Sequence, residues 1–487
     1  MSYQRSKQAG ILTTAEFIRF GFKSLVGIIL ARILTPAELG SYRQLFLIYT
    51  TFSTLLLLGI PQSVMVLLPK LRHIDSKREY ISKVVNLITI LAFVFSLAIF
   101  AFRHLIADKF HNPGMSNLLV LFAVYPLFMF ITQIYSALML GLKQPQKTAR
   151  FTIFSVVTDT VLILGLAILT KNLAYTVFGV MLSAFLQWGF AHYNLVYYKT
   201  KVGFDLEFLR DLLQYSLPLG LSSIIGMLSI QLDKFVISGF FRPADFAVFS
   251  IGAMELPFVS ILSNSVNSIL LPHISSDTDN LATTYRAAVR KNALIVLPLC
   301  VIFFILAKPL ITLLYTSQYE ASVPIFRVYL LILPLRIATF GIIFMALGKT
   351  RYIMYNAILT LLLNLVLNLI LVRQIGMIGA ALATVLVTWI SAGVYLYWIK
   401  HKLGLSLAAL FPCTAILRTA LAAVIAGAFA YFTIQLNPGY LFSALGLLVF
   451  IVSYVVLGYL LKAILPYDFQ LLKELLLNTL RKTKIIN

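Results

Sequence analysis

Ten ionisable side chains of this 487-residue sequence lie inside long apolar segments. Such a position is costly for a charge, so the side chain usually faces a cavity, a partner or the membrane surface. The acidic residues are Glu16, Asp159, Asp233 and Glu255, and the basic residues are Arg19, Lys23, Lys234, Arg327, Arg336 and Arg418. The arginines at positions 327 and 418 lie near segment ends, where their side chains can extend to the lipid headgroups. The other eight residues are the candidates for chemistry.

Four of the cations could attract an anionic substrate into a cavity. Glu16, Arg19 and Lys23 are spaced by three and four residues, which places them on one face of a helix. This trio either neutralises itself through a Glu–Arg pair or forms a polar stripe along a central cavity. Arg336 has no acidic neighbour in sequence and needs a carboxylate from another segment or an anionic ligand. We predict substrate-binding roles for Arg19, Lys23, Lys234 and Arg336.

The acidic residues could couple transport to an ion gradient. Asp159 and Glu255 are single acids in apolar segments. Each is either a neutral carboxylic acid that is hydrogen-bonded between helices or a group that takes up H⁺ or Na⁺. Asp233 and Lys234 are adjacent, so their side chains diverge by about 100° on a helix and a local salt bridge is not expected. The predicted ion-coupling residues are Glu16, Asp159, Asp233 and Glu255.

Other kinds of site have little support in the sequence. The six histidines are scattered near segment ends without the spacing of metal ligands. The two cysteines, Cys300 and Cys413, both lie in apolar segments and are interpreted as small core residues. We therefore expect no metal, no cofactor and no catalytic residue.

The composition indicates that membrane-spanning helices position the candidate residues. Apolar residues make up 60% of the chain and charged residues only 11%, whereas a soluble domain carries about 25% charged residues. A spanning helix needs about 20 apolar residues. We predict fourteen spans, near residues 9–33, 43–68, 81–102, 117–140, 151–170, 174–197, 216–240, 246–271, 293–315, 325–347, 353–372, 379–399, 412–434 and 441–464.

The net charge of +22 follows from the predicted topology. With fourteen spans, 25 of the 39 lysines and arginines lie on the side of the termini and 8, Arg43 among them, on the other side. The remaining six lie inside spans. Because basic residues gather in cytoplasmic loops, both termini are predicted to be cytoplasmic, in the cytoplasmic membrane. The basic excess then faces anionic membrane lipids, and no nucleic-acid partner is expected.

The chain also repeats itself. TPAELGSY (35–42) follows the first predicted span and RPADFAVF (242–249) follows the seventh, so that Pro36 and Pro243 are 207 residues apart. Gly141 and Gly348, each at the end of a span, have the same separation. An offset of six spans gives both copies the same orientation, which predicts two lobes about a pseudo-two-fold axis along the membrane normal, with a cavity between them.

The predicted fold class is an all-α polytopic membrane protein, with two pseudo-symmetric six-helix lobes and two extra C-terminal helices. The predicted divisions are an N-lobe over 1–202, an interfacial linker helix over 203–215, a C-lobe over 216–404, the last two spans over 405–466, and a cytoplasmic amphipathic tail over 467–487.

Two stretches resemble the polysaccharide flippases of the Wzx kind. ILARILTPAELGSYRQLF (28–46) is similar to the end of the first span in that family, and GLKQPQKTAR (141–150) is similar to the turn after its fourth span. The family belongs to the MOP superfamily, with the MurJ flippases and the MATE exporters. The resemblance implies two six-helix lobes with alternating access that move a polyprenyl-diphosphate-linked oligosaccharide across the membrane for surface polysaccharide biosynthesis. It also implies polysaccharide-assembly proteins as partners and cationic residues in the cavity.

Two alternatives remain open at the level of the sequence. A MATE-like antiporter of drugs or cations would need an acidic, aromatic cavity. A membrane glycosyl polymerase or ligase would need a catalytic site in an outer loop, and the longest predicted outer loop, 103–116, is short. Its candidates are Arg103, His104 and Asp108.

Overall fold

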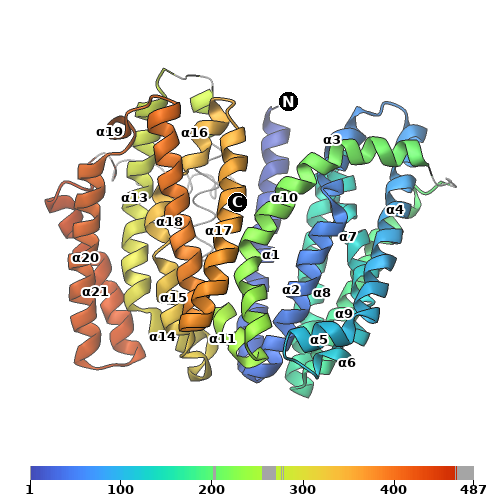
Figure 1. The fold of residues 1–487 in the computed structure, drawn as a ribbon, viewed down its shortest axis with the longest axis horizontal. Helices are drawn as coiled ribbons and strands as arrows, with labels where there is room; N and C mark the ends of the chain where they lie inside the picture. The colour runs from blue at the N-terminus through green and yellow to red at the C-terminus, as the bar shows by residue number, and fades with distance from the viewer. Residues whose placement is uncertain are drawn as a thin grey trace, which may run out of the picture. The chain divides into compact units, whose positions relative to one another are not determined.

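The computed structural model describes residues 2–200, 205–254, 270–275, 277, 279–466 and 468, with side chains from residue 12 onward. Throughout these ranges the regular elements are helices (Figure 1). In the described part of the chain, ten helices are long and apolar enough to cross a membrane. Two pairs of shorter helices, bent by 46° and 49°, would each add one span. The chain is an integral membrane protein with an all-helical fold, as predicted.

The predicted number of fourteen spans is not confirmed, because the described residues contain ten to twelve. Helix α1 (Ser2–Ile33) covers the predicted first span, but it carries three charged residues within its apolar stretch. The predicted span 246–271 includes residues 255–269, which lie outside the described residues. The same holds for most of the predicted tail 467–487.

The helices group into two compact units. The first unit comprises Met1–Ile251, Leu314–Tyr319 and Asn364–Ala380. Its helices are α1, α2 (Pro36–Leu57), α3 (Ile60–Leu67), the 3₁₀ helix η1 (Leu68–Lys70), α4 (Ile74–Ala101), α5 (Arg103–Lys109), α6 (Met115–Phe122), α7 (Tyr125–Gly141), α8 (Pro145–Thr170), α9 (Leu173–Val196), α10 (Leu206–Phe240), α11 (Pro243–Gly252) and the 3₁₀ helix η2 (Ser317–Tyr319).

The second unit comprises Gly252–Leu313, Glu320–Leu363 and Ala381–Asn487. Its helices are α13 (Leu281–Ile305), α14 (Ala307–Tyr315), α15 (Ser322–Leu330), the 3₁₀ helix η3 (Leu333–Ile337), α16 (Phe340–Ala346), α19 (Leu407–Leu410), α20 (Cys413–Leu436) and α21 (Tyr440–Leu460). Helices α17 (Arg351–Ile375) and α18 (Met377–Lys402) contribute to both units, and the last residues of α11 and α14 also cross the boundary.

The sequence dictates where α2 begins. Thr35 and Glu38 form a capping box, in which the Glu38 backbone N–H donates to Thr35 Oγ1 (3.3 Å) and the Thr35 backbone N–H donates to Glu38 Oε2 (3.0 Å). Pro36 occupies the first helical turn, where its missing N–H costs nothing. The helix ends at Leu57, and α3 continues at an angle of 46° after Gly59, which has a φ of +74°. A Cβ on Gly59 would lie 2.6 Å from the backbone nitrogen of Gly220, so α10 packs directly against this break.

The two copies of the repeated motif meet in the first unit. Arg43 Nη1 donates a hydrogen bond to Ser250 Oγ (2.6 Å), and these two residues are 207 positions apart. Gly40 lies against the backbone of Pro243, because a Cβ on this glycine would collide with the Pro243 carbonyl. The starts of α2 and α11 therefore pack against each other within the first unit.

Helix α10 joins the predicted linker to the predicted seventh span. It runs without interruption over 35 residues, with Pro218 inside it, and Figure 1 shows its first part running in a different direction from the rest. A proline within a helix allows such a bend because it removes one backbone hydrogen bond. By their contacts α10 and α11 group with the first unit, across the predicted boundary at residue 216.

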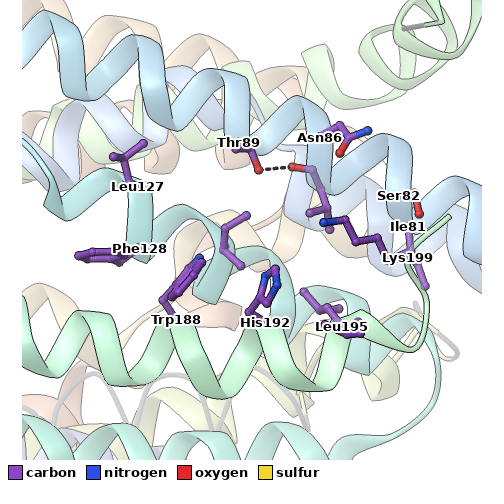
Figure 2. Close-up of a pocket in the computed structure, with 13 residues that line it drawn as sticks. Ile81, Ser82, Asn86, Thr89, Leu127, Phe128, Trp188, His192, Leu195 and Lys199 are labelled. Atoms are coloured by element: carbon purple, nitrogen blue, oxygen red, sulfur yellow. Dashed lines mark hydrogen bonds between the residues drawn. The ribbon is translucent and has the colours of Figure 1, made fainter. Parts of the chain in front are cut away.

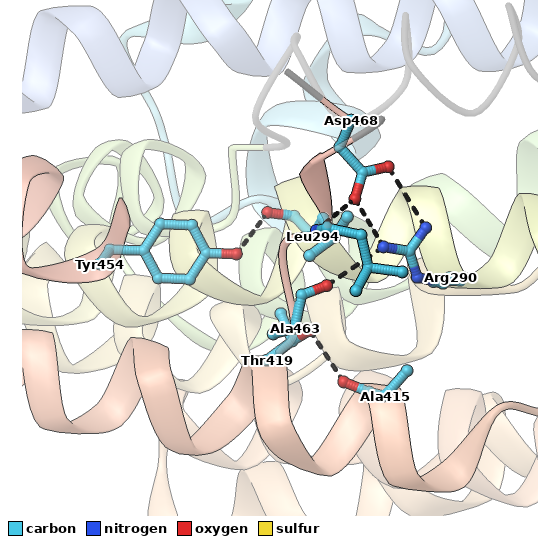
Figure 3. Close-up of polar contacts among 8 residues, drawn as sticks. Arg290, Leu294, Ala415, Thr419, Tyr454, Ala463 and Asp468 are labelled. Carbon is cyan, nitrogen blue, oxygen red and sulfur yellow. Dashed lines mark hydrogen bonds and ion pairs between the residues drawn. The ribbon is translucent and has the colours of Figure 1, made fainter. Parts of the chain in front are cut away.

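The last two helices pack within the second unit. Phe450 on α21 forms a buried cluster with Ala426 and Ala430 on α20 and with Ile302 on α13. Figure 3 shows the polar contacts beside it, where Arg290 of α13 donates to Asp468 beyond the end of α21 (2.6 Å). The two side chains are only 14% and 12% exposed, respectively. The ion pair therefore attaches the end of the described chain to α13.

Candidate functional site

A cavity of about 350 Å³ lies within the first unit between α1, α2, α10 and α11. It is lined by Lys23, Val26, Gly27, Leu30, Tyr42, Arg43, Phe46, Leu47, Thr50, Gln231, Lys234, Phe246 and Ser250. The lining residues of α1 recur at intervals of three and four, which places them on one face of that helix, and those of α2 follow the same periodicity. We call this space the cationic cavity.

Three cations from three helices line the cationic cavity. They are Lys23 of α1, Arg43 of α2 and Lys234 of α10. Lys234 Nζ donates to Gln231 Oε1 (3.0 Å), and Gln231 Nε2 donates to Thr50 Oγ1 (3.3 Å). None of the thirteen lining residues is acidic. Three positive charges that meet in a cavity without an opposing carboxylate favour an anionic ligand there.

The structure brings together two of the four predicted substrate-binding residues, Lys23 and Lys234. Arg19 does not line the cavity: its guanidinium pairs with Glu16 at 2.5 Å, and both side chains are half exposed. In the trio on α1, Glu16 and Arg19 therefore pair with each other, and Lys23 lines the cavity. Arg336 belongs to the second unit and lies in η3, which interrupts the predicted tenth span.

Asp159 of α8 lies in a polar network with α9. Its Oδ1 accepts hydrogen bonds from Ser183 Oγ (2.6 Å) and from Gln187 Nε2 (2.8 Å), both on α9. Helix α1, which carries Lys23, packs against α8, which carries Asp159. The acid thus lies in a polar network behind α1, outside the lining of the cavity.

The other acidic candidates are placed differently. Asp233 is only 5% exposed, and its Oδ1 accepts a hydrogen bond from the backbone N–H of Lys234 (2.7 Å). Its side chain does not line the cationic cavity, whereas that of Lys234 does, as expected for neighbours that diverge on a helix. Glu255 lies outside the described residues.

Arg43 is the cavity residue that the sequence reasoning missed, because it was placed in an outer loop. Two signals could have found it. The capping box at Thr35 starts α2 early enough to put Arg43 in its second turn. The 207-residue offset also pairs it with Ser250 of the second copy, whose hydroxyl it contacts. A span that begins at Pro36 puts this arginine inside the helix, whereas a span that begins at residue 43 puts it at the end of the preceding loop.

The chain matches one family model and two relatives. The model, described as polysaccharide biosynthesis protein, matches residues 29–324, which include the cavity-lining parts of α2, α10 and α11. The capsular polysaccharide biosynthesis protein CapF of Staphylococcus aureus is 22% identical over 403 residues, 78% of this chain and 95% of that protein. An uncharacterized membrane protein of Methanocaldococcus jannaschii, MJ1375, is 26% identical over 234 residues, 43% of this chain. The chain covers about half of that second relative, 54% of its length.

Solved structures share the fold. The lipid II flippase MurJ in an inward closed conformation matches 92% of this chain and 98% of its own, with a TM-score of 0.77 and 18% identity. An inward-facing multidrug resistance MATE transporter of the MOP superfamily matches 79% of this chain and 94% of its own, with a TM-score of 0.63 and 14% identity. A MOP superfamily transporter from Pyrococcus furiosus matches 81% and 94%, with a TM-score of 0.54 and 16% identity. At these identities the likeness concerns the fold, which is that of MurJ and MATE transporters.

Proposed function

This chain belongs to the family of polysaccharide biosynthesis proteins, and on that premise we propose that it is a membrane transporter, not an enzyme. Its substrate is an oligosaccharide linked to a polyprenyl diphosphate, which it flips from the cytoplasmic to the outer leaflet by alternating access. The observation that carries the proposal is the cationic cavity, with Lys23, Arg43 and Lys234 in its lining and no carboxylate.

The chemistry of the cavity suits a diphosphate next to a sugar. A diphosphate that enters hydrocarbon alone loses its hydration at a large cost in free energy. Lys23, Arg43 and Lys234 replace that hydration, and the arginine can hold two phosphate oxygens at once. Thr50 and Gln231, a hydroxyl and an amide in the same lining, are suitable partners for sugar hydroxyls. The polyprenyl tail stays in the lipid.

The proposal includes coupling of transport to an ion gradient, with Asp159 as the main candidate for the residue that couples the two. Asp159 lies on α8, which packs against α1, so protonation of the acid would change the charge next to the helix that carries Lys23 to the cavity. Glu16, Asp233 and Glu255 stay secondary candidates. Arg19 and Arg336 stay candidate substrate contacts for other steps of the cycle, outside this cavity.

The proposed setting is the cytoplasmic membrane with both termini in the cytoplasm, supported by the threefold excess of basic residues on the side of the termini. The proposed partners are the lipid-linked oligosaccharide, anionic membrane lipids and other proteins of polysaccharide assembly. CapF, named for capsular polysaccharide biosynthesis, supports this pathway class.

The test is flipping of a fluorescent polyprenyl-diphosphate oligosaccharide in vesicles that contain the purified protein. Replacement of Lys23, Arg43 and Lys234 together by Gln should abolish flipping, because the cavity then offers no charge to the diphosphate. Conservative replacement of the two lysines by Arg should retain most of it. Arg150, an exposed residue of α8 that does not line the cavity, supplies the matched control as Arg150→Gln.

Two outcomes contradict the proposal. Wild-type flipping by the triple variant would show that the cavity does not carry the substrate. Proton-driven uptake of organic cations into the same vesicles, without flipping, would favour the drug or cation antiporter. Such an antiporter fits poorly with a cavity that carries three cations and no acid.

A further inference from the structure

A second cavity, of about 410 Å³, lies in the first unit between α4, α7 and α9. It shares no lining residue with the cationic cavity. Figure 2 shows Trp188 and His192 on α9 and Lys199 in the segment after it, with their side chains directed into the space that faces α4. The proposed transport function makes no use of this second cavity.

One end of the second cavity is polar and carries unused hydrogen-bonding groups. It is formed by Asn86 of α4, His192 of α9 and Lys199. Among the residues that the structure describes, the side chains of these three make no hydrogen bond or ion pair. An ammonium, an amide and an imidazole therefore converge on one space, and the described residues give their side chains no hydrogen-bonding or ionic partner.

The other end is apolar and rigid. It is lined by Leu127 and Phe128 at the start of α7 and by Trp188. The Trp188 ring is held between the Phe128 ring, at a centroid distance of 5.9 Å, and the His192 ring, stacked at 5.1 Å. With a ring on each side, the indole lies at the boundary between the apolar and the polar end.

The two ends are separated by a distance that suits a lipid. Lys199 lies three residues beyond Val196, the last residue of α9. Trp188 lies eight residues before Val196, which is about 12 Å along the helix axis. Half of the hydrocarbon core is about 15 Å thick. Because α9 is a candidate membrane span, the cavity runs from the end of that span over a distance comparable to the depth of one leaflet.

The charges of the lining favour a ligand with a negatively charged headgroup. None of its thirteen residues is acidic, and the neighbouring Lys83 is already paired with Glu79 and Asp205, each at 2.6 Å. A negatively charged phosphate gains charge-assisted hydrogen bonds from Lys199 and neutral ones from Asn86. The ammonium group of a zwitterionic headgroup finds no carboxylate there.

We propose that the second cavity binds an anionic phospholipid of the surrounding bilayer. The phosphate of this lipid lies against Lys199, Asn86 and His192, and one acyl chain lies along Leu127, Phe128 and Trp188. The site is independent of the proposed flipping activity, so either proposal can fail without the other.

The test is lipid binding to the purified full-length protein, measured by native mass spectrometry with phosphatidylglycerol and, separately, phosphatidylethanolamine of the same acyl chains. Phosphatidylglycerol with a photoreactive acyl chain maps the contact. Cross-links are expected in peptides that contain residues 125–131 and 185–199. Lys199→Gln should weaken phosphatidylglycerol binding about tenfold, the loss of one charge-assisted hydrogen bond.

Two further variants separate the contribution of the Lys199 charge to lipid binding from that of the shape of the cavity. Val85→Trp fills the cavity from α4 while Lys199 stays in place, and it should remove the cross-links. Arg150→Gln removes a surface charge elsewhere in the first unit and should change nothing. Phosphatidylethanolamine, whose ammonium group offsets its phosphate charge, should bind more weakly than phosphatidylglycerol and should lose less affinity on Lys199→Gln.

Any of three results overturns the proposal. The first is phosphatidylglycerol binding and cross-linking that are unchanged by Lys199→Gln and Val85→Trp, as expected for a lysine and a tryptophan that merely sit at the membrane surface. The second is equal binding of both lipids. The third is displacement of the lipid by millimolar inorganic phosphate or by a polyprenyl phosphate, which would assign the cavity to a soluble anion or to the transported substrate.

Discussion

Arg43 in the first unit and Arg290 in the second are both shielded arginines, but their partners differ. Arg290 donates to the Asp468 carboxylate and to the backbone carbonyl of Ala463, so its charge and its donors are satisfied by the protein. Arg43 donates to one neutral hydroxyl, that of Ser250, and faces a cavity with two lysines. A charge that the fold neutralises stabilises the fold, whereas a charge left facing a cavity is available to a ligand.

The largest effect is expected for Arg290, the arginine whose charge the protein neutralises. Arg290→Met leaves Asp468 without its cation in a shielded position and should lower the free energy of unfolding by about 3–5 kcal/mol. Thermal unfolding in detergent measures it. The double variant with Asp468→Leu should recover part of the loss, and flipping per folded molecule should stay at the wild-type level. A stable Arg290→Met protein that no longer flips would reverse the assignment of the two arginines.

The next largest effect is expected for Arg43, which faces the cationic cavity without a carboxylate in the lining. Arg43→Gln should reduce flipping about 10–100-fold, because one charged contact to the diphosphate is lost. Its unfolding temperature should change little, since the residue gives up one hydrogen bond to a neutral group. The measurements are flipping in vesicles and thermal unfolding of the same preparation. If stability falls and flipping per folded molecule does not, Arg43 is a structural residue.

A smaller effect tests whether the starts of α2 and α11, which carry Arg43 and Ser250, pack closely against each other. Gly40→Ala puts a methyl group into the Pro243 backbone and should cost about 2 kcal/mol of stability through overpacking. Gly165→Ala on α8 is the matched control, because nothing lies within 4 Å of its added methyl group. Chemical denaturation in mild detergent compares them. Equal stability of the two variants would show that α2 and α11 do not pack closely there.

The smallest effect concerns an ion pair at the membrane surface. The Lys83 ammonium donates to Asp205, and this hydrogen bond holds the pKa of the Asp205 carboxyl below its usual range. A lowered pKa in the folded state contributes stability above the unfolded pKa, near 4, and that contribution is lost as the pH falls through the folded value. We expect a slight loss of stability below pH 4 that Asp205→Asn removes. A pH series of unfolding temperatures that is identical for both proteins would contradict it.

The candidate site could be predicted in part because helical periodicity is local. Lys23 and Lys234 were found from their charge inside apolar segments, and both line the cationic cavity. Arg19 was chosen by the same rule, yet it pairs with Glu16 one turn away. Whether a cation pairs with its neighbour or faces a cavity depends on side-chain direction and on the helices opposite. Arg43 was missed because the start of a helix depends on its cap, here the Thr35–Glu38 pair.

The sequence by itself determined that this is an integral membrane protein, that it is helical, and that it carries a repeat with an offset of 207 residues. Composition and periodicity are sufficient for this, since the bilayer requires about 20 apolar residues per span and every backbone group bonded within its own helix. Only the tertiary structure decided which charges meet. It joined Lys23, Arg43 and Lys234 from three helices, paired Arg290 with Asp468, and opened a second cavity beside Lys199. Charges and cavities of this kind arise from the packing of residues far apart in the chain, which no local pattern encodes.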